Sequence, residues 1–480
     1  MSLTTCKAHS PSKCDNYTIT NSCNTETCSD AADTKDDAPS GPKPNEDNGT
    51  ALILTSYIEE DRIDDGRKAA EVDPGLFLGF KSYSGFLTVN KTHNSNMYFW
   101  YFPVPDKPVN ETPWMVWLQG GPGASSLIGL FDEIGPFTVN EEGNLDCNPH
   151  TWLQNHSLVF IDNPVGSGYS FTEHEDGLVK DAETYSKHLY SALRQFLELF
   201  PEQRAAPLVI AGESYAGKYV PALAMEVHRH KNLPGGDINL RGLMVGNGYV
   251  DTRMLAESAR PFYEFGLVDK EQVQFLQPTI DSLRRDIEAG RVTKQGRSKW
   301  LQIRRKLTEM SGVPVVYNFL EDHAFVAGKF AKFLLKSEVK RALHVGDINF
   351  TAENITVTAA LIGEFMVNPR PWYETLLNHY DVIVLCGQLD LALSCTVASE
   401  QYRSWQWDLK DEFLNATRCP LRFEGRVAGY HKTGGRFTEV VVRGAGHLAP
   451  KDAPAPMQWL AAQWTYARPL PLSVCRPPRI

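Results

Sequence analysis

The sequence predicts an α/β protein in which a mostly parallel central sheet is flanked by helices. Short apolar runs typical of buried strands recur along the 480 residues, and helix-length amphipathic segments separate several of them. A long, charged stretch with a helical pattern and no buried strand interrupts this alternation. Because ligands bind above the carboxyl ends of parallel strands, such an insertion is expected to form a helical cap over the site.

Each predicted strand has its own pattern. The runs are 83–89, 97–102, 114–118, 158–161, 208–211, 243–245, 382–385 and 437–442. The first two alternate or are aromatic, as antiparallel edge strands are, whereas most of the others are almost wholly apolar, as buried strands are. Among the helical segments, 181–200 places Tyr185, Leu189, Phe196 and other apolar side chains on one face.

The chain is expected to divide into five segments. Residues 1–70 hold too few apolar side chains to offset their chain entropy, which predicts a flexible extension. The core would follow in two parts, 71–253 and 343–470, around the cap insertion at 254–342, and a tail at 471–480 would end the chain.

Composition excludes several classes of function. The net charge of −10 and the lack of a basic patch with interleaved aromatic residues argue against nucleic acid as a partner. The locally basic segment 284–306 is interpreted as a solvated helix face; it contains Arg284, Arg285, Arg291, Lys294, Arg297, Lys299, Arg304, Arg305 and Lys306. No run approaches the roughly 20 apolar residues of a membrane span.

Cysteines and sequons favour a secreted or lysosomal/vacuolar protein, although no signal peptide is visible in the sequence. The spacing of Cys6, Cys14, Cys23 and Cys28 favours disulfides over a metal site, and the odd total of nine leaves at least one thiol unpaired or intermolecular. Eight Asn-x-Ser/Thr sequons exceed the roughly three expected by chance. Besides Asn16 and Asn48, the sequons are the candidate glycosylation sites Asn90, Asn110, Asn155, Asn349, Asn354 and Asn415.

A candidate nucleophile lies in the turn 212–217, Gly-Glu-Ser-Tyr-Ala-Gly, between a predicted strand and a predicted helix at 218–230. Small residues let such a turn expose Ser214, although an ordinary loop fits the motif equally well by itself. A serine hydroxyl needs a base oriented by a carboxylate. Asp390 and His447 both follow predicted strands, and the chain order Ser, Asp, His is the one that α/β-hydrolases use.

Four long motifs make the chain resemble the serine carboxypeptidase family, and within it the vitellogenic-like branch, from about residue 74 to residue 466. They are 117–126 (WLQGGPGASS), 162–170 (DNPVGSGYS), 212–221 (GESYAGKYVP) and the segments around Asp390 and His447. The resemblance implies an α/β-hydrolase fold that needs no cofactor or metal. It also implies that peptide or protein C-termini are the substrates.

The resemblance also implies roles for single residues. The backbone N–H groups of Gly121 and Tyr215 would form the oxyanion hole. The free carboxylate of the substrate would be bound by Gln119, Gly120, Glu133 and Glu213. Because neighbouring carboxyl groups cannot all be ionised at short range, protons must be shared among them, and binding is expected to favour acid pH.

Two alternatives stay open at this point. One is an acyltransferase or esterase on the same scaffold, because a fold does not determine the reaction. The other is a binding or protective protein with little catalysis, against which the intact Ser214, Asp390 and His447 argue. The sequence also leaves a homodimer open.

Overall fold

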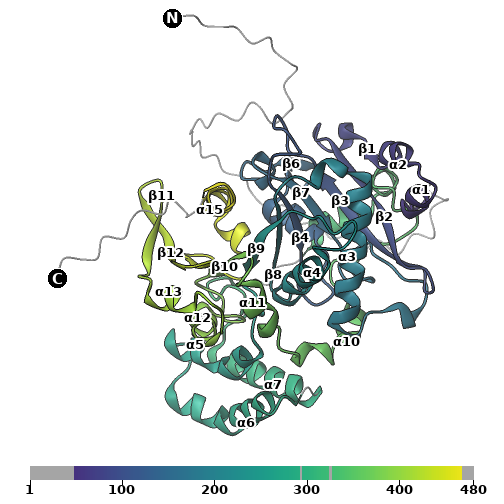
Figure 1. The fold of residues 1–480 in the computed structure, drawn as a ribbon. Helices are drawn as coiled ribbons and strands as arrows, with labels where there is room; N and C mark the ends of the chain where they lie inside the picture. Colours follow the sequence, from purple (N-terminus) through teal and green to yellow (C-terminus); the bar gives the residue numbers. More distant parts are fainter. Residues whose placement is uncertain (1–47, 292–293, 324–326, 468–480) are drawn as a thin grey trace, which may run out of the picture.

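The central feature of the structure is an 11-stranded mixed sheet. A computed structural model describes residues 48–291, 294–323 and 327–467 (Figure 1). The strands are β1 (Glu71–Val72), β2 (Ser82–Asn90), β3 (Ser95–Phe102), β4 (Trp114–Leu118), β7 (Ser157–Ile161), β8 (Leu208–Glu213), β9 (Leu240–Gly246), β10 (Asp381–Gly387), β11 (Cys419–Phe423), β12 (Arg426–Gly434) and β13 (Phe437–Val442). A separate hairpin joins β5 (Phe137–Val139) and β6 (Leu145–Cys147).

The middle of the sheet is parallel. The strand order is β1-β2-β3-β7-β4-β8-β9-β10-β13-β12-β11, and the six strands from β7 to β13 pair in parallel. The remaining strands pair antiparallel at the two edges. This confirms the predicted mostly parallel sheet with antiparallel edge strands, and all eight predicted strands are present. The hairpin β11–β12 was not predicted.

Each central strand is buried on both faces, which explains its continuous apolar sequence. In β4, for example, Trp114, Val116 and Leu118 belong to one core cluster, while Met115 and Trp117 belong to the other. Since side chains alternate along a strand, one apolar run supplies both cores.

Helices cover both faces of the sheet. They are α1 (Thr55–Glu59), α2 (Ile63–Ala69), α3 (Ala182–Leu199), α4 (Ala216–His230), α5 (Ala259–Glu264), α6 (Lys270–Glu288), α7 (Lys294–Ser311), α8 (Gly328–Leu334), α9 (Ser337–Ala342), α10 (Ile355–Ala360), α11 (Arg370–Leu376), α12 (Cys395–Ser404), α13 (Lys410–Asn415), α14 (Ala449–Asp452) and α15 (Pro454–Tyr466). Apolar residues of α3 and α4 lie in the first core, and those of α15 lie in the second. Helix α3 begins after Asp181, whose side chain accepts a hydrogen bond from the Thr184 N–H and caps the helix.

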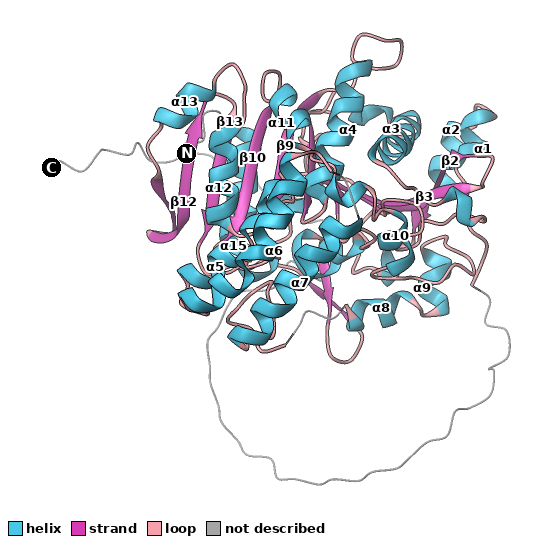
Figure 2. Cartoon of the chain, turned by 90° about the horizontal axis from the view of Figure 1, so that it is seen from below, coloured by secondary structure: helices cyan, strands magenta, loops and turns pink. Residues whose placement is uncertain are grey.

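The predicted insertion 254–342 is helical, but its helices divide into two groups. Helices α5, α6 and α7 pack together at the lower edge of Figure 1 and lie in the foreground of Figure 2, which views the chain from below. Helices α8 and α9 add Phe330, Phe333 and Val339 to the second core. Helices α5, α6 and α7 add residues such as Phe262 and Ile303 to the first. The division of the chain into core and cap stays a proposal, in which α5, α6 and α7 would form the cap.

The structure differs from expectation between residues 48 and 70. This part of the predicted flexible extension forms α1 and α2, and Leu54 is fully buried. Its backbone is also paired, because Leu54 N–H donates to Phe86 O and Phe86 N–H donates to Leu52 O. A few apolar residues sufficed because the sheet edge supplied their partners. Residues 1–47 and the predicted tail lie outside the described residues.

Candidate active site

Ser214 lies in the turn between β8 and α4 with a backbone φ of 61°, a left-handed conformation that is uncommon for residues other than glycine. Three backbone hydrogen bonds hold it there: its N–H donates to Gly246 O over 3.0 Å, and its carbonyl accepts from Gly217 and Tyr249, each over 2.9 Å. A Cβ atom at Gly212 would lie 2.3 Å from Leu118 O, so only glycine fits where the end of β8 lies beside β4. The local sequence is therefore that of a tight strand-to-helix turn with the serine at its tip.

Asp390 and His447 meet above the ends of β10 and β13. The Nδ1 atom of His447 lies 2.7 Å from Oδ2 of Asp390, and both side chains are buried. The other oxygen of Asp390 accepts hydrogen bonds from the N–H groups of Ala392 and Leu393, which orient the carboxylate. The Nε2 atom of His447 has no hydrogen-bond partner among the described residues, and His447 lines the same cavities as Ser214. The ring is thus held at one nitrogen and open at the other.

Two residues near Asp390 and His447 were not predicted from the sequence. Asn247, directly after β9, donates through Nδ2 to Asp390 Oδ2 over 2.8 Å and accepts from Gly387 N–H over 3.0 Å. Its signal was available, because a polar residue at the carboxyl end of a buried parallel strand is a candidate site residue. Tyr317 stacks on His447 with ring centroids 4.3 Å apart, and nothing in the sequence distinguished it from other tyrosines.

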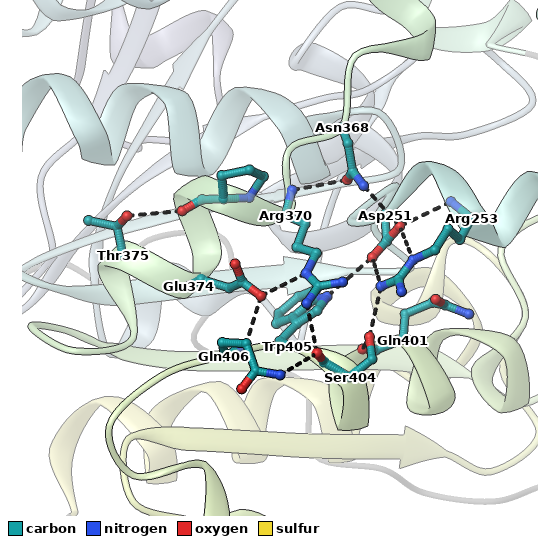
Figure 3. Close-up of polar contacts among 11 residues, drawn as sticks. Asp251, Arg253, Asn368, Arg370, Glu374, Thr375, Gln401, Ser404, Trp405 and Gln406 are labelled. Carbon is teal, nitrogen blue, oxygen red and sulfur yellow. Dashed lines mark hydrogen bonds and ion pairs between the residues drawn. The ribbon is translucent and has the colours of Figure 1, made fainter. Parts of the chain in front are cut away.

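The segment that follows β9 is anchored by a polar network around Asp251 (Figure 3). The fully buried Asp251 carboxylate accepts from Arg253 Nε over 3.0 Å and from Asn368 Nδ2 over 3.1 Å. Arg370, at the start of α11, donates to Ser404 O at the end of α12 over 2.7 Å. These contacts tie the chain that carries Asn247 and Tyr249 to two helices outside the sheet.

The turn after β4 brings a second set of backbone amides to Ser214. A Cβ atom at Gly120 would lie 2.5 Å from Tyr215 N and 2.6 Å from Ser214 Cβ, so the two turns touch. Among the described residues, neither the Gly121 nor the Tyr215 N–H donates a hydrogen bond. The geometry leaves two amide donors beside the serine hydroxyl, as an anionic oxygen requires.

Gln119, Glu133 and Glu213 form a buried cluster beside Ser214. Gln119 Nε2 donates to Glu213 Oε1 over 2.7 Å and approaches Glu133 Oε1 at 3.5 Å. Trp117 Nε1 donates to Gln119 Oε1 over 2.8 Å, which fixes the orientation of the amide. Glu133 comes from a π-helical turn, Gly129–Ile134, that packs against β5, α14 and α15. The structure thus brings together three residues that are far apart in the sequence.

Both glutamates have raised pKa values. Burial raises the pKa of Glu133 to about 8, and burial together with the neighbouring Glu133 carboxylate raises the pKa of Glu213 well above its usual range. The Oε2 atoms of both residues are buried without a hydrogen-bond partner among the described residues. A protonated carboxyl with a free oxygen can donate to an anion, which an ionised one cannot.

Ser214 lines two cavities. Gly121, Tyr317 and His447 also line both of them. The first, here called the Gln119 cavity, has a volume of about 330 Å³ and is also lined by Gln119, Gly120, Glu213, Glu353 and Asn354. The second, the Tyr215 cavity, has about 70 Å³ and is also lined by Tyr215, Tyr249, Trp300, Arg304 and Phe365. The site therefore has a polar, acidic side and an aromatic side.

The structure describes some of the cysteines and most of the sequons. Cys386 and Cys395 form a disulfide across the loop that contains Asp390, and Cys147 and Cys419 are also disulfide-bonded. The N-terminal cysteines and the sequons at Asn16 and Asn48 lie outside the described residues or at their margin. Of the other sequons, Asn110, Asn349 and Asn415 are exposed, whereas Asn90, Asn155 and Asn354 are partly buried.

The described part of the chain contains neither a metal-binding cluster nor a membrane-spanning helix. It holds no cluster of three or more His, Cys, Asp or Glu side chains suited to a metal ion. Within the same residues, none of the helices combines the length and the apolarity needed to cross a bilayer.

Comparison with known proteins agrees with this geometry. Residues 74–467 match the family model described as serine carboxypeptidase. The human probable serine carboxypeptidase CPVL is 36% identical over 86% of this chain and 88% of its own length. Vitellogenic carboxypeptidase from Aedes aegypti is 34% identical over 85% and 88%, and venom serine carboxypeptidase from Apis mellifera is 34% identical over 85% and 89%.

The solved structures support the same fold. A prohormone-processing carboxypeptidase, Kex1Δp from Saccharomyces cerevisiae, aligns with a TM-score of 0.74 over 83% of this chain and 96% of its own, at 21% identity. The sheet, the turn at Ser214 and the order Ser, Asp, His confirm the predicted α/β-hydrolase fold. The chain belongs to the serine carboxypeptidase family.

Proposed function

We propose that this chain releases the C-terminal residue of peptides and proteins through an acyl-enzyme on Ser214, with the free carboxylate of the substrate bound by Gln119, Glu133 and Glu213. The observation that carries the proposal is the buried pair of glutamates beside Ser214, each with a raised pKa and an unpartnered oxygen. Such a pair is costly to bury unless it binds something. A substrate carboxylate supplies the missing partner.

The chemical steps follow from the positions of three side chains. Ser214 Oγ attacks the scissile carbonyl carbon while His447 Nε2 takes its proton, and the N–H groups of Gly121 and Tyr215 donate to the oxyanion. When the C–N bond breaks, His447 returns the proton to the leaving amine. Water then attacks the ester by the same route and frees Ser214. Asp390 keeps the Nδ1 proton of His447 in place throughout.

Recognition of the free carboxylate depends on shared protons. Glu133 and Glu213 are protonated below their raised pKa values, so that they donate to the substrate carboxylate together with Gln119 and the Gly120 N–H. Above these values the pair becomes anionic and repels the substrate. We therefore propose an acid pH preference for binding.

The alternative activities predict different substrates. The reaction of an esterase or acyltransferase does not require two glutamates with raised pKa values beside the nucleophile. The function of a binding protein does not require an aligned Asp390 and His447. Both features support the exopeptidase over the alternatives.

The deciding experiment compares an N-blocked dipeptide with its C-terminal amide. We expect release of one free amino acid from the acid and no release from the amide, because the amide lacks the carboxylate. Ser214→Ala should lower kcat by roughly 10⁴-fold or more and abolish labelling by a serine-directed phosphonate. Equal hydrolysis of the acid and the amide would contradict carboxypeptidase activity, and labelling of the Ser214→Ala variant would contradict the nucleophile.

The cellular context also belongs to the proposal. Disulfide-bonded cysteines support an oxidising compartment, and exposed sequons at Asn110, Asn349 and Asn415 support glycosylation. We infer a secreted or lysosomal/vacuolar protein. Mass loss on treatment with a glycosidase, and the sedimentation coefficient, would test glycosylation and the hypothesis of a homodimer.

A further inference from the structure

Two arginines of α7 lie against the aromatic wall of the Tyr215 cavity. Arg304 Cζ lies 4.8 Å from the ring centroid of Trp300, and Arg297 Cζ lies 5.3 Å from that of Phe365. Trp300, Arg304 and Phe365 line the cavity. In a helix, positions 297, 300 and 304 share one face, so α7 presents alternating cations and an indole to the site.

These arginines differ from five other cations of the segment 284–306, which was predicted to be a solvated face. Ion pairs with acidic neighbours hold Arg284, Arg291, Lys299, Arg305 and Lys306. Among the described residues, Arg304 and Arg297 form no ion pair, and Nε of Arg297 is buried without an acceptor. The solvated-face interpretation therefore fails for these two positions.

Arg304 is a partly buried cation whose N–H donors have no acceptor among the described residues. Burial lowers the pKa of its guanidinium from the usual value, yet an arginine stays protonated in any case. Stacking on Trp300 uses the face of the guanidinium and leaves the N–H donors at its edge free. Tyr317 and the Asp390 carboxylate are its electrostatic neighbours, but among the described residues neither accepts a hydrogen bond from it. A ligand carboxylate that accepts from those donors would therefore stabilise the charge.

The position of the cavity decides which part of a substrate reaches it. Glu213 and Gln119 line the Gln119 cavity and not the Tyr215 cavity. If they bind the free carboxylate, the leaving residue occupies the Gln119 cavity. The residue that acylates Ser214 then directs its side chain into the Tyr215 cavity on the opposite side of the nucleophile.

On the basis of the proposed function, we infer that Arg304 makes this enzyme select substrates whose penultimate side chain is acidic, Asp or Glu. The aromatic rings of Tyr215, Trp300 and Phe365 contact the methylene groups of that side chain, and the guanidinium of Arg304 binds its carboxylate. The selectivity resides in a helix of the predicted insertion rather than in the core.

The test compares two N-blocked dipeptides that differ only in Glu or Gln at the penultimate position and share one C-terminal residue. At about pH 6 the glutamate is ionised. We expect kcat/KM to be roughly ten- to a hundredfold higher for the Glu substrate, the range of a partly buried charged hydrogen bond. Equal values for the two substrates would overturn the inference and leave the proposed function intact. If neither substrate is cleaved, both are overturned.

Variants separate recognition from structure. Arg304→Gln should abolish the preference, so that the ratio of kcat/KM for the Glu substrate to that for the Gln substrate falls to about one. Arg305→Gln is the matched control, since it removes the same charge one position later, where the side chain is 81% exposed, and should keep the preference. Arg304→Glu should favour a penultimate Lys. An equal loss for both substrates in Arg304→Gln would assign Arg304 a merely structural role.

Discussion

At the scale of single residues, the proposed recognition of a carboxylate follows from the raised pKa values of Glu133 and Glu213. Both side chains are nearly inaccessible to solvent, and Gln119 holds them through one amide. Two adjacent carboxyl groups in a buried site cannot both ionise without a large penalty. In the proposed function, the protons that these two groups retain are donated to the substrate carboxylate.

This arrangement predicts how activity depends on pH. A carboxyl group is protonated at a pH below its pKa. The pKa of Glu133 is raised to about 8, so the proton that is proposed to bind the substrate is lost as the pH rises through about 8. We expect KM for a blocked dipeptide to increase severalfold between about pH 5 and pH 8.5.

The matched variants make this prediction specific. Glu133→Gln keeps an N–H donor at every pH and should flatten the alkaline rise in KM, whereas Glu142→Gln, at an exposed position, should retain it. A wild-type KM that is the same at both ends of the range would contradict the role of the pair.

At the scale of elements, the site depends on the contact between two turns. The loop after β4 and the turn between β8 and α4 approach so closely that only hydrogen fits at Gly120. Parallel pairing of β4 with β8 sets this distance, since Leu118 lies beside Gly212 in the register. The two amides that face the serine therefore depend on sheet register as well as on loop sequence.

Substitution of Gly120 tests this contact. In Gly120→Ala, the new methyl group would meet Tyr215 N and Ser214 Cβ at 2.5 and 2.6 Å and push the turns apart, so kcat should fall by roughly a hundredfold, as when an oxyanion donor is lost. The control is Gly363→Ala, where no atom lies within 4 Å of the added methyl group. A folded Gly120→Ala protein with unchanged kcat would refute the argument.

At the scale of the whole molecule, buried titratable groups set the pH range of stability. Burial lowers the pKa of His156 to about 3, so this imidazole binds a proton more readily in the unfolded chain than in the folded chain. The stability of the fold therefore falls as the pH drops below about 6.5. The raised pKa values of Glu133 and Glu213 act in the opposite direction. There the folded chain keeps protons that the unfolded chain releases above about pH 4.5, so stability falls as the pH rises.

We therefore expect Tm to be highest under mildly acidic conditions. The double variant Glu133→Gln/Glu213→Gln should gain Tm over wild type at about pH 8 and differ little at about pH 4, where both carboxyls are protonated in either state. Thermal unfolding in a series of buffers measures this. An equal shift in Tm at both pH values would mean that the variant acts through packing and not through protonation.

The sequence by itself determined eight strands of the sheet, the turn at Ser214 and the chain order of Ser214, Asp390 and His447. The predicted strands 114–118 and 437–442 coincide with β4 and β13, because burial on both faces leaves an uninterrupted apolar run. The turn at Ser214 was recognisable because small residues in a strand-to-helix turn are a local requirement. Local patterns of this kind need no knowledge of distant partners.

Only the tertiary structure decided which distant residues meet. Asn247 binds Asp390 across 143 positions of sequence, and residues 48–70 fold because the edge of the sheet supplies their partners. The same holds for charge: Arg304 and Arg305 are neighbours on one helix, yet one lines the Tyr215 cavity and the other forms a solvent-exposed ion pair. Burial, pKa and specificity arise from packing between segments, which no local pattern in the chain encodes.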